Sequence, residues 1–212
     1  MRVVTGEAKG KKLKSPKTIG TRPIMDRVKT ALFDILAPEV PDTRFLDLFA
    51  GTGGVGIEAL SRGAARATFI EMDSKIVKLV HENLQITGLA DRAETIHGDS
   101  FKFLQAYQLQ PVQQPQRRSG EQEKRLYIPA PRDGQGRTYN IIYVAPPQYE
   151  EMAARALDLL VRSSLPAEDG LIIVQIHPKE RPGVVAVDPH SFALTDERRY
   201  ESTLLLFYRR NA

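Results

Sequence analysis

The chain has 212 residues, 42% of them hydrophobic, and a formal net charge of +4, which suits one hydrophobic core with a small appendage. The absence of cysteine excludes disulfides, thiolate zinc sites, iron–sulfur clusters and every mechanism that needs a cysteine nucleophile. No apolar run reaches the ~20 residues of a membrane span and the N-terminus has no signal-peptide hydrophobic region, so we expect a cytoplasmic or organelle-matrix protein.

The positive charge is concentrated at the N-terminus. Residues 1–36 contain nine Lys or Arg and three Asp or Glu, a net charge of +6, which leaves −2 for the rest of the chain. Lys and Arg neutralise nucleic-acid phosphates whatever the base sequence, so this segment predicts an RNA-binding arm, with a solubilising tail as the alternative. The candidate RNA-binding residues are Lys9, Lys11, Lys12, Lys14 and Arg22.

The segment 21–36 predicts an amphipathic helix, because its apolar residues recur at helical spacing. Thr21 suits the N-cap of this helix and Pro23 suits its first turn. A break after the helix separates a basic extension with its helix, residues 1–40, from a larger domain, residues 41–212.

From Thr43 onward, segments with the patterns of strands and helices alternate. Strands are predicted over 44–49, 67–72, 93–99, 139–145 and 170–177, and helices over 54–63, 73–88, 100–107 and 149–164. The last two segments, 190–200 and 202–210, have no helical period and predict an antiparallel hairpin. This alternation is typical of an α/β protein with a doubly wound, mainly parallel sheet, here of seven strands.

Residues 108–138 do not fit the alternation. They are rich in Gln, Pro and Arg and lack an apolar period. A structureless stretch of this length is unusual inside a compact domain, so we expect a flexible insertion. A solvated linker is the simpler interpretation, and an RNA contact, favoured by the excess of basic residues, is the alternative.

A glycine-rich turn follows the first predicted strand of the domain. Gly51, Gly53 and Gly56 form the pattern G-x-G-x-x-G, which by itself fits a dinucleotide-binding turn. Asp47, four residues before the first glycine, distinguishes the alternatives, because a pyrophosphate gains nothing from a nearby carboxylate. S-adenosylmethionine has an ammonium group, a sulfonium group and no phosphate, so the pattern favours this cofactor.

Two further acids end the next two predicted strands. Glu71 is expected to bind the ribose hydroxyls, and Asp99 lies where an acid or its neighbours reach the adenine edge. Each acid also has a structural interpretation, as a turn partner, a solvated strand end or a helix N-cap. Ligands bind at the carboxyl ends of parallel strands, so the three acids together predict a cofactor site. The candidate cofactor-binding residues are Asp47, Phe49, Gly51, Thr52, Gly53, Gly56, Glu71, Met72, Asp99 and Ser100.

Two prolines follow the predicted strand 139–145. The candidate catalytic residues are Ala145, Pro146, Pro147, Gln148 and Tyr149. The prolines stiffen the backbone, so they can aim the carbonyl of Ala145 or Pro146 at a bound substrate. Tyr149 either stacks on an extruded base or begins the next helix, and Gln148 is a candidate for binding a base edge. The four histidines have no spacing that indicates a metal site.

The chain resembles the bacterial 16S ribosomal RNA guanine-N2 methyltransferases, the RsmD family, in the stretches "MRVVTGEAKGKKLKSP", "TRPIMDRVKTALFDIL", "FLDLFAGTGGVGIEALSRGA", "IEMD", "GDSFKFL" and "APPQY". The resemblance covers nearly the whole chain except residues 108–138. It implies a Rossmann-like class I methyltransferase fold, S-adenosylmethionine as cofactor, and methylation of one guanine amine in small-subunit rRNA on an assembled or nearly assembled particle. It also implies that Arg22 lies at the mouth of the active site. Family members generally have Asp or Asn in place of Ala145, and an aromatic residue in place of Gln148.

Two other functions remain open at the level of sequence. One is an enzyme of the same fold that acts on a protein or a small molecule, which the basic N-terminal segment disfavours. The other is a non-catalytic RNA-binding assembly factor that keeps the cofactor pocket, which only the altered proline motif favours. Covalent C5 methylation of pyrimidines is excluded, because it requires a cysteine.

Overall fold

The computed structural model of the chain describes residues 1–16, 25–109, 128, 136–148 and 151–211. The helices are α1 (Asp26–Ile35), α2 (Gly54–Ser61), α3 (Ser74–Thr87), α4 (Ser100–Gln105), α5 (Met152–Val161) and α6 (Arg181–Val185), and short 3₁₀ helices cover Ala90–Arg92 and Pro178–Glu180. The strands are β1 (Arg44–Asp47), β2 (Arg66–Glu71), β3 (Ala93–His97), β4 (Tyr139–Val144), β5 (Pro166–Ile176), β6 (Phe192–Tyr200) and β7 (Thr203–Arg210).

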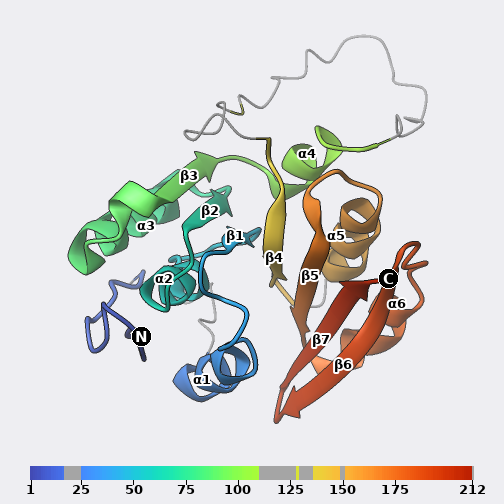
Figure 1. Cartoon of the computed structure of the whole chain (residues 1–212), viewed down its shortest axis with the longest axis horizontal. Coiled ribbons are helices and arrows are strands. Elements are labelled where there is room, and N and C mark those ends of the chain that lie inside the picture. The colour runs from blue at the N-terminus through green and yellow to red at the C-terminus, as the bar shows by residue number, and fades with distance from the viewer. Residues whose placement is uncertain (17–24, 110–127, 129–135, 149–150, 212) are drawn as a thin grey trace.

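The strands form one seven-stranded sheet in the order β3-β2-β1-β4-β5-β7-β6. Strands β1 to β5 pair in parallel, and β7 runs antiparallel to both β5 and β6. Figure 1 shows the hairpin β6–β7 at the opposite end of the sheet from β3. The predicted doubly wound, mainly parallel sheet with a C-terminal antiparallel hairpin is therefore confirmed. The strand order reverses between β1 and β4, which is the switch point where such sheets bind ligands.

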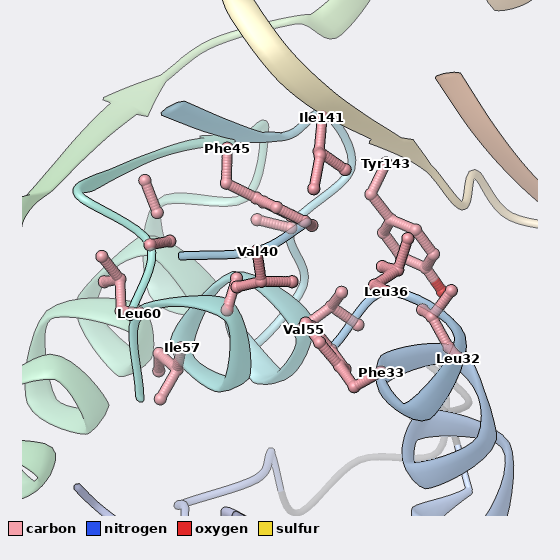
Figure 2. Packing of buried hydrophobic residues seen from close by; sticks show 14 of the residues in the cluster. Leu32, Phe33, Leu36, Val40, Phe45, Val55, Ile57, Leu60, Ile141 and Tyr143 are labelled. Atoms are coloured by element: carbon pink, nitrogen blue, oxygen red, sulfur yellow. The ribbon is translucent and has the colours of Figure 1, made fainter. Parts of the chain in front are cut away.

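Two hydrophobic clusters cover the two faces of the sheet. Helices α1, α2 and α3 contribute to the first cluster, and α4 and α5 contribute to the second. Figure 2 shows part of the first cluster, in which Leu32 and Leu36 lie beside Tyr143 of β4. Phe33 of α1 stacks on Phe45 of β1 with 6.5 Å between the ring centroids. Helix α1 therefore packs against the two strands that flank the switch point.

Residues 1–16, which we call the N-terminal strap, pack against the helices of the first cluster. The strap buries Val3, Ala8 and Leu13 there. Glu58 of α2 accepts hydrogen bonds from two main-chain N–H groups of the strap at 2.8 and 2.9 Å. Glu58 also forms an ion pair of 3.1 Å with Lys29 of α1, both side chains being fully buried. The segment predicted as a basic arm thus begins with residues that belong to the core packing.

Helix α6 was not predicted from the sequence. The stretch between the last parallel strand and the hairpin is short and contains three prolines, at positions 178, 182 and 189. Pro182 lies in the first turn of α6, where the N–H group that proline lacks has no intrahelical partner in any case. Thr21 and Pro23, the predicted N-cap and first-turn residues of α1, lie outside the described residues.

Both flanks of the 108–138 segment are attached to the domain. Gln108 donates hydrogen bonds from Nε2 to the carbonyls of Leu104 and Leu159 at 2.9 and 3.0 Å. At the other flank, Arg137 is buried and binds both carboxylate oxygens of Glu94, at 2.7 and 2.8 Å. Residues 110–127 and 129–135 lie outside the described part of the chain, so the flexible insertion stays a prediction.

Candidate active site

The candidate cofactor residues gather at the carboxyl ends of β1, β2 and β3. Asp47 ends β1, Glu71 ends β2, and Asp99 follows the end of β3. Their surroundings are joined by hydrogen bonds, because Glu71 binds the turn after β1 and Ser100 Oγ donates to the carbonyl of Leu48. The parallel sheet therefore brings together three acids that the sequence separates by more than fifty residues.

Asp47 is the buried acid at the centre of this group. Its side chain is 1% exposed, and Oδ2 accepts a hydrogen bond of 3.0 Å from the N–H of Gly56. Burial raises the pKa of Asp47 from 3.8 to about 7; the bond from Gly56 opposes this rise, and the nearby charge of Glu71 adds to it. A carboxylate held in this way is stabilised by a cation and destabilised by another anion. The environment of Asp47 therefore suits a positively charged ligand rather than a phosphate.

The glycines of the turn serve different purposes. Gly51 has φ +51°, and a Cβ built on it would have no heavy atom within 4 Å, so the backbone there is open to a ligand. A Cβ on Gly56 would lie 2.3 Å from the ring of Phe69, so this glycine allows α2 to pack closely on β2. Gly56 thus supports the site through packing and through its N–H bond to Asp47.

Glu71 is held by the main chain on both sides. Oε2 accepts a hydrogen bond from Gly51 N at 2.9 Å, and Oε1 accepts one from Asp73 N at 2.8 Å. A carboxylate has about four acceptor positions, so it can still bind two hydroxyl groups. Met72, the next residue, is 69% exposed and presents an apolar surface beside this acid. The pair of an oriented acid and an exposed thioether fits a ribose and its base.

Asp99 has the structural role that the sequence offered as an alternative. It is the N-cap of α4, and Oδ1 accepts hydrogen bonds from Phe101 N at 2.7 Å and Lys102 N at 3.4 Å. Its second oxygen, Oδ2, accepts no hydrogen bond from a described residue. Asp99 therefore has an oriented carboxylate with one oxygen left for a ligand.

Beside these acids lies a cluster of two aromatic rings and an arginine. We call this cluster, formed by Phe49, Phe101 and Arg155, the Phe49 stack. Phe49 contacts Phe101 edge to face, with 5.8 Å between centroids and 65° between the ring planes. The guanidinium carbon of Arg155 lies 4.1 Å from the centroid of Phe101. Arg155 was not among the predicted site residues, since nothing local in the sequence relates it to a ring 54 positions earlier.

The proline motif follows β4 at the switch point. Pro146 is buried, Ala145 and Gln148 are half-buried, and Pro147 is exposed. Tyr143, two residues before Ala145, is in register with Asp47 of β1 and donates a hydrogen bond of 2.6 Å to Gln175 Oε1. Burial raises the pKa of Tyr143 well above its ordinary value, so its hydroxyl stays protonated and fixes β4 against β5.

Of the remaining predicted residues, Thr52 and Gly53 lie in the buried part of the glycine turn. Tyr149 and Arg22 lie outside the described residues, so their predicted roles stay predictions.

The lysines of the strap differ in their contacts. Lys11 donates a hydrogen bond from Nζ to the carbonyl of Thr87 at 3.0 Å, and Lys14 forms an ion pair of 2.7 Å with Glu82. The exposed side chains of Lys9 and Lys12 make no hydrogen bond or ion pair with a described residue. Half of the predicted RNA-binding lysines of the strap are therefore free to meet an external anion.

Within the described ranges, no group of three or more His, Asp or Glu side chains is arranged to hold a metal ion. None of the described helices has the length and apolar character needed to cross a membrane.

Known proteins resemble this chain in both sequence and structure. A family model described as conserved hypothetical protein 95 matches residues 1–116. The ribosomal RNA small subunit methyltransferase D of Escherichia coli K12 is 33% identical over 175 residues, covering 82% of this chain and 74% of that protein. The solved structure of the E. coli protein yhhF has a TM-score of 0.75 at 31% identity, covering 100% of this chain and 98% of that one. An RNA methyltransferase from Salinibacter ruber, solved with S-adenosyl-L-homocysteine, has a TM-score of 0.56 at 16% identity, over 90% of this chain and 94% of that one.

Proposed function

Because this chain belongs to the ribosomal RNA small subunit methyltransferase D family, we propose that it methylates the exocyclic N2 amine of a guanine in small-subunit ribosomal RNA, within a small-subunit particle. The chain is an S-adenosylmethionine-dependent rRNA methyltransferase; the acceptor atom and the particle are the proposed parts. The observation that carries the assignment is Asp47, a buried carboxylate at the switch point whose environment favours a cationic ligand.

The residues present fit S-adenosylmethionine. Asp47 offers a carboxylate for the cationic end of the cofactor, and Gly51 leaves open space beside the turn. Glu71 has acceptor capacity for the ribose hydroxyls, and Met72 presents an apolar surface for the adenine. When bound, the cofactor supplies a methyl group on a sulfonium, which becomes a neutral thioether after the transfer.

The proline motif is proposed to orient the acceptor. The guanine N2 amine is a poor nucleophile, because its lone pair is delocalised into the ring. A backbone carbonyl of Ala145 or Pro146 would accept a hydrogen bond from the amine and so direct its lone pair toward the methyl carbon. Alignment of this kind can lower the activation free energy by ~7–11 kcal/mol. Family members generally have Asp or Asn where this chain has Ala145. The substitution costs about one charge-assisted hydrogen bond to the amine, worth ~1.5–3 kcal/mol, and the backbone acceptors stay in place.

The test uses cofactor labelled in its methyl group. The protein is incubated with naked small-subunit rRNA and, separately, with small subunits that lack the modification, and the product nucleoside is identified by mass spectrometry. We expect labelled N2-methylguanosine, at a higher rate from the particle. Label in protein would instead support a same-fold enzyme with a protein substrate. No label, together with intact binding of both cofactor and RNA, would support the non-catalytic assembly factor.

A further inference from the structure

The Phe49 stack holds a cation at a defined place. Arg155 lies in the first turn of α5, and its guanidinium covers the face of Phe101 at 4.1 Å. Phe49 supports the same ring from the side. A guanidinium over an aromatic face is attracted by the ring quadrupole and loses little freedom when its edges bind a further group. The stack therefore positions the charge in advance of binding.

The charge of Arg155 is available to a ligand. The residue is exposed, and its side chain makes no hydrogen bond or ion pair with any described residue. Arg162, at the opposite end of α5, differs in this respect because it pairs with Asp158 at 2.8 Å. The contact with the Phe101 ring leaves the N–H groups of Arg155 without an acceptor among the described residues. These groups match two oxygens of one phosphate.

The place of Arg155 in the fold relates it to both parts of the site. It lies seven positions after Gln148, the last described residue of the proline motif. Its partner Phe101 is the second residue of α4, directly after the candidate cofactor residues Asp99 and Ser100. Arg155 is therefore connected along the chain to the proline motif and through Phe101 to the helix that Asp99 caps. An extruded nucleotide needs its flanking backbone held while the base is out of the stack.

We propose that Arg155, held on Phe101, binds a backbone phosphate of the rRNA next to the methylated guanine. This inference rests on the proposed function, since it assigns to that site the residue that holds the flanking strand. The chemistry of a fixed planar cation with free N–H groups fits a phosphate. The cofactor has no phosphate that Arg155 could bind. In the proposed function the positive charge of the cofactor is bound by Asp47 beside the glycine turn.

The test compares Arg155→Met, Arg155→Lys and the control Arg162→Met on the same helix. The Met variants keep an apolar stem and remove the charge. Affinity for unmodified small subunits is measured at several salt concentrations, and cofactor affinity is measured by calorimetry. For Arg155→Met we expect RNA affinity to fall about ten- to a hundredfold and the salt slope to fall by ~0.7–0.9. Arg155→Lys keeps the slope and loses part of the affinity, and Arg162→Met changes neither.

Two results would overturn the inference. Wild-type RNA affinity and salt slope in Arg155→Met would show that the charge does not meet the RNA. Reduced cofactor affinity with unchanged RNA affinity would assign the stack to the cofactor. Failure of the proposed function is seen separately, since the wild-type protein would then place no label in RNA. Wild-type labelling together with an unaffected Arg155→Met variant contradicts only the role of Arg155.

Discussion

The side-chain amide of Asn83 forms two hydrogen bonds with the main chain of Lys14. Lys14 N donates to Oδ1 of Asn83 at 2.7 Å, and Nδ2 of Asn83 donates to the carbonyl of Lys14 at 3.1 Å. The same Nδ2 donates to the carbonyl of Thr52, in the glycine turn, at 3.0 Å. Asn83 is fully buried. One amide therefore connects the N-terminal strap to the turn that carries candidate cofactor residues.

Replacing Asn83 with Ala is expected to disturb the strap and the turn together. The change leaves main-chain groups of Lys14 and Thr52 without their partner, at ~1–3 kcal/mol for each group that stays buried. We predict a loss of about 2–4 kcal/mol in the free energy of unfolding and a severalfold loss of cofactor affinity. Asn140→Ala is the control, because Asn140 Oδ1 accepts a main-chain bond from Arg44 N at 3.0 Å, at the far end of β1. Equal cofactor affinity in both variants would contradict the connection.

The buried Asp47 makes the stability of the ligand-free protein depend on pH. Its pKa is about 7 in the folded state and near 3.8 in the unfolded chain, so the folded state binds the extra proton between these values. This contribution favours the fold at low pH and is lost as the pH rises through 7. Asp47→Asn removes it, so the variant should be more stable than the wild type at pH 8.

The size of this effect follows from the pKa of Asp47. Each pKa unit is worth ~1.4 kcal/mol. The rise in the pKa of Asp47 from 3.8 to about 7 therefore limits the gain in stability of Asp47→Asn at pH 8 to on the order of 4 kcal/mol. Urea denaturation of the wild type and of Asp47→Asn at several pH values measures the difference in their free energies of unfolding. This difference should shrink toward pH 4. A difference that stays constant from pH 5 to pH 8 would show that Asp47 does not titrate in this range.

Glu71→Ala is expected to weaken the binding of S-adenosylmethionine about ten- to a hundredfold, because the change removes an oriented acceptor for polar groups of the cofactor. Titration calorimetry measures this. Asp73→Ala is a nearby control, since the Asp73 side chain caps α3 and its loss costs ~1 kcal/mol of stability. Asp47→Ala should weaken cofactor binding as well; unchanged affinity in both acid variants would refute the cofactor assignment.

The four lysines of the strap are predicted to contribute unequally to RNA binding. Replacing Lys9 and Lys12 with Gln should lower the slope of affinity against salt by up to ~1.4–1.8, if both meet phosphate. Replacing Lys11 and Lys14 should change the slope less, because these side chains already bind Thr87 and Glu82. Cofactor affinity serves as the internal control. A salt slope equal to that of the wild type in the quadruple variant would identify the strap lysines as solubilising.

Ala145→Asn is predicted to raise the single-turnover methylation rate. The added amide restores an acceptor for the target amine, which is worth at most ~10- to 100-fold, and cofactor binding should stay unchanged. If the chain has instead repacked around Ala145 with Gln148 as the contact, Gln148→Ala slows methylation and Ala145→Asn does not help. Unchanged methylation rates in Ala145→Asn, Gln148→Ala and Pro146→Gly would show that the active site does not include this motif.

The sequence predicted the fold and the position of Asp47 and Glu71 at the ends of β1 and β2, because both depend on local patterns. Asp47 and Glu71 are marked by the strands that they end, and a parallel sheet brings such ends together whatever lies between them. The function of the basic N-terminal segment, residues 1–36, was interpreted from its charge alone. A count of charges includes Lys29 among the basic residues of the arm, whereas the fold pairs it with Glu58 in the core.

Contacts between distant segments account for what the sequence did not reveal. Asn83 interrupts the apolar face of α3 with a polar residue, which indicates a buried contact without naming its partner. Arg155 gives no such signal, because Phe101 reaches it only once α4 and α5 have packed together. Pairings of this kind depend on tertiary geometry rather than on local periodicity.

The attachment of both flanks of the 108–138 segment has a consequence for the evolution and the engineering of this enzyme. Gln108 and Arg137 are secured by contacts with the domain itself. Chain length between two secured points costs little, since each doubling of a flexible loop adds only ~0.6 kcal/mol of closure entropy. A change in the length of this stretch is therefore expected to cost little stability, and a fluorescent domain inserted there is expected to report the location of the enzyme in the cell without stopping methylation.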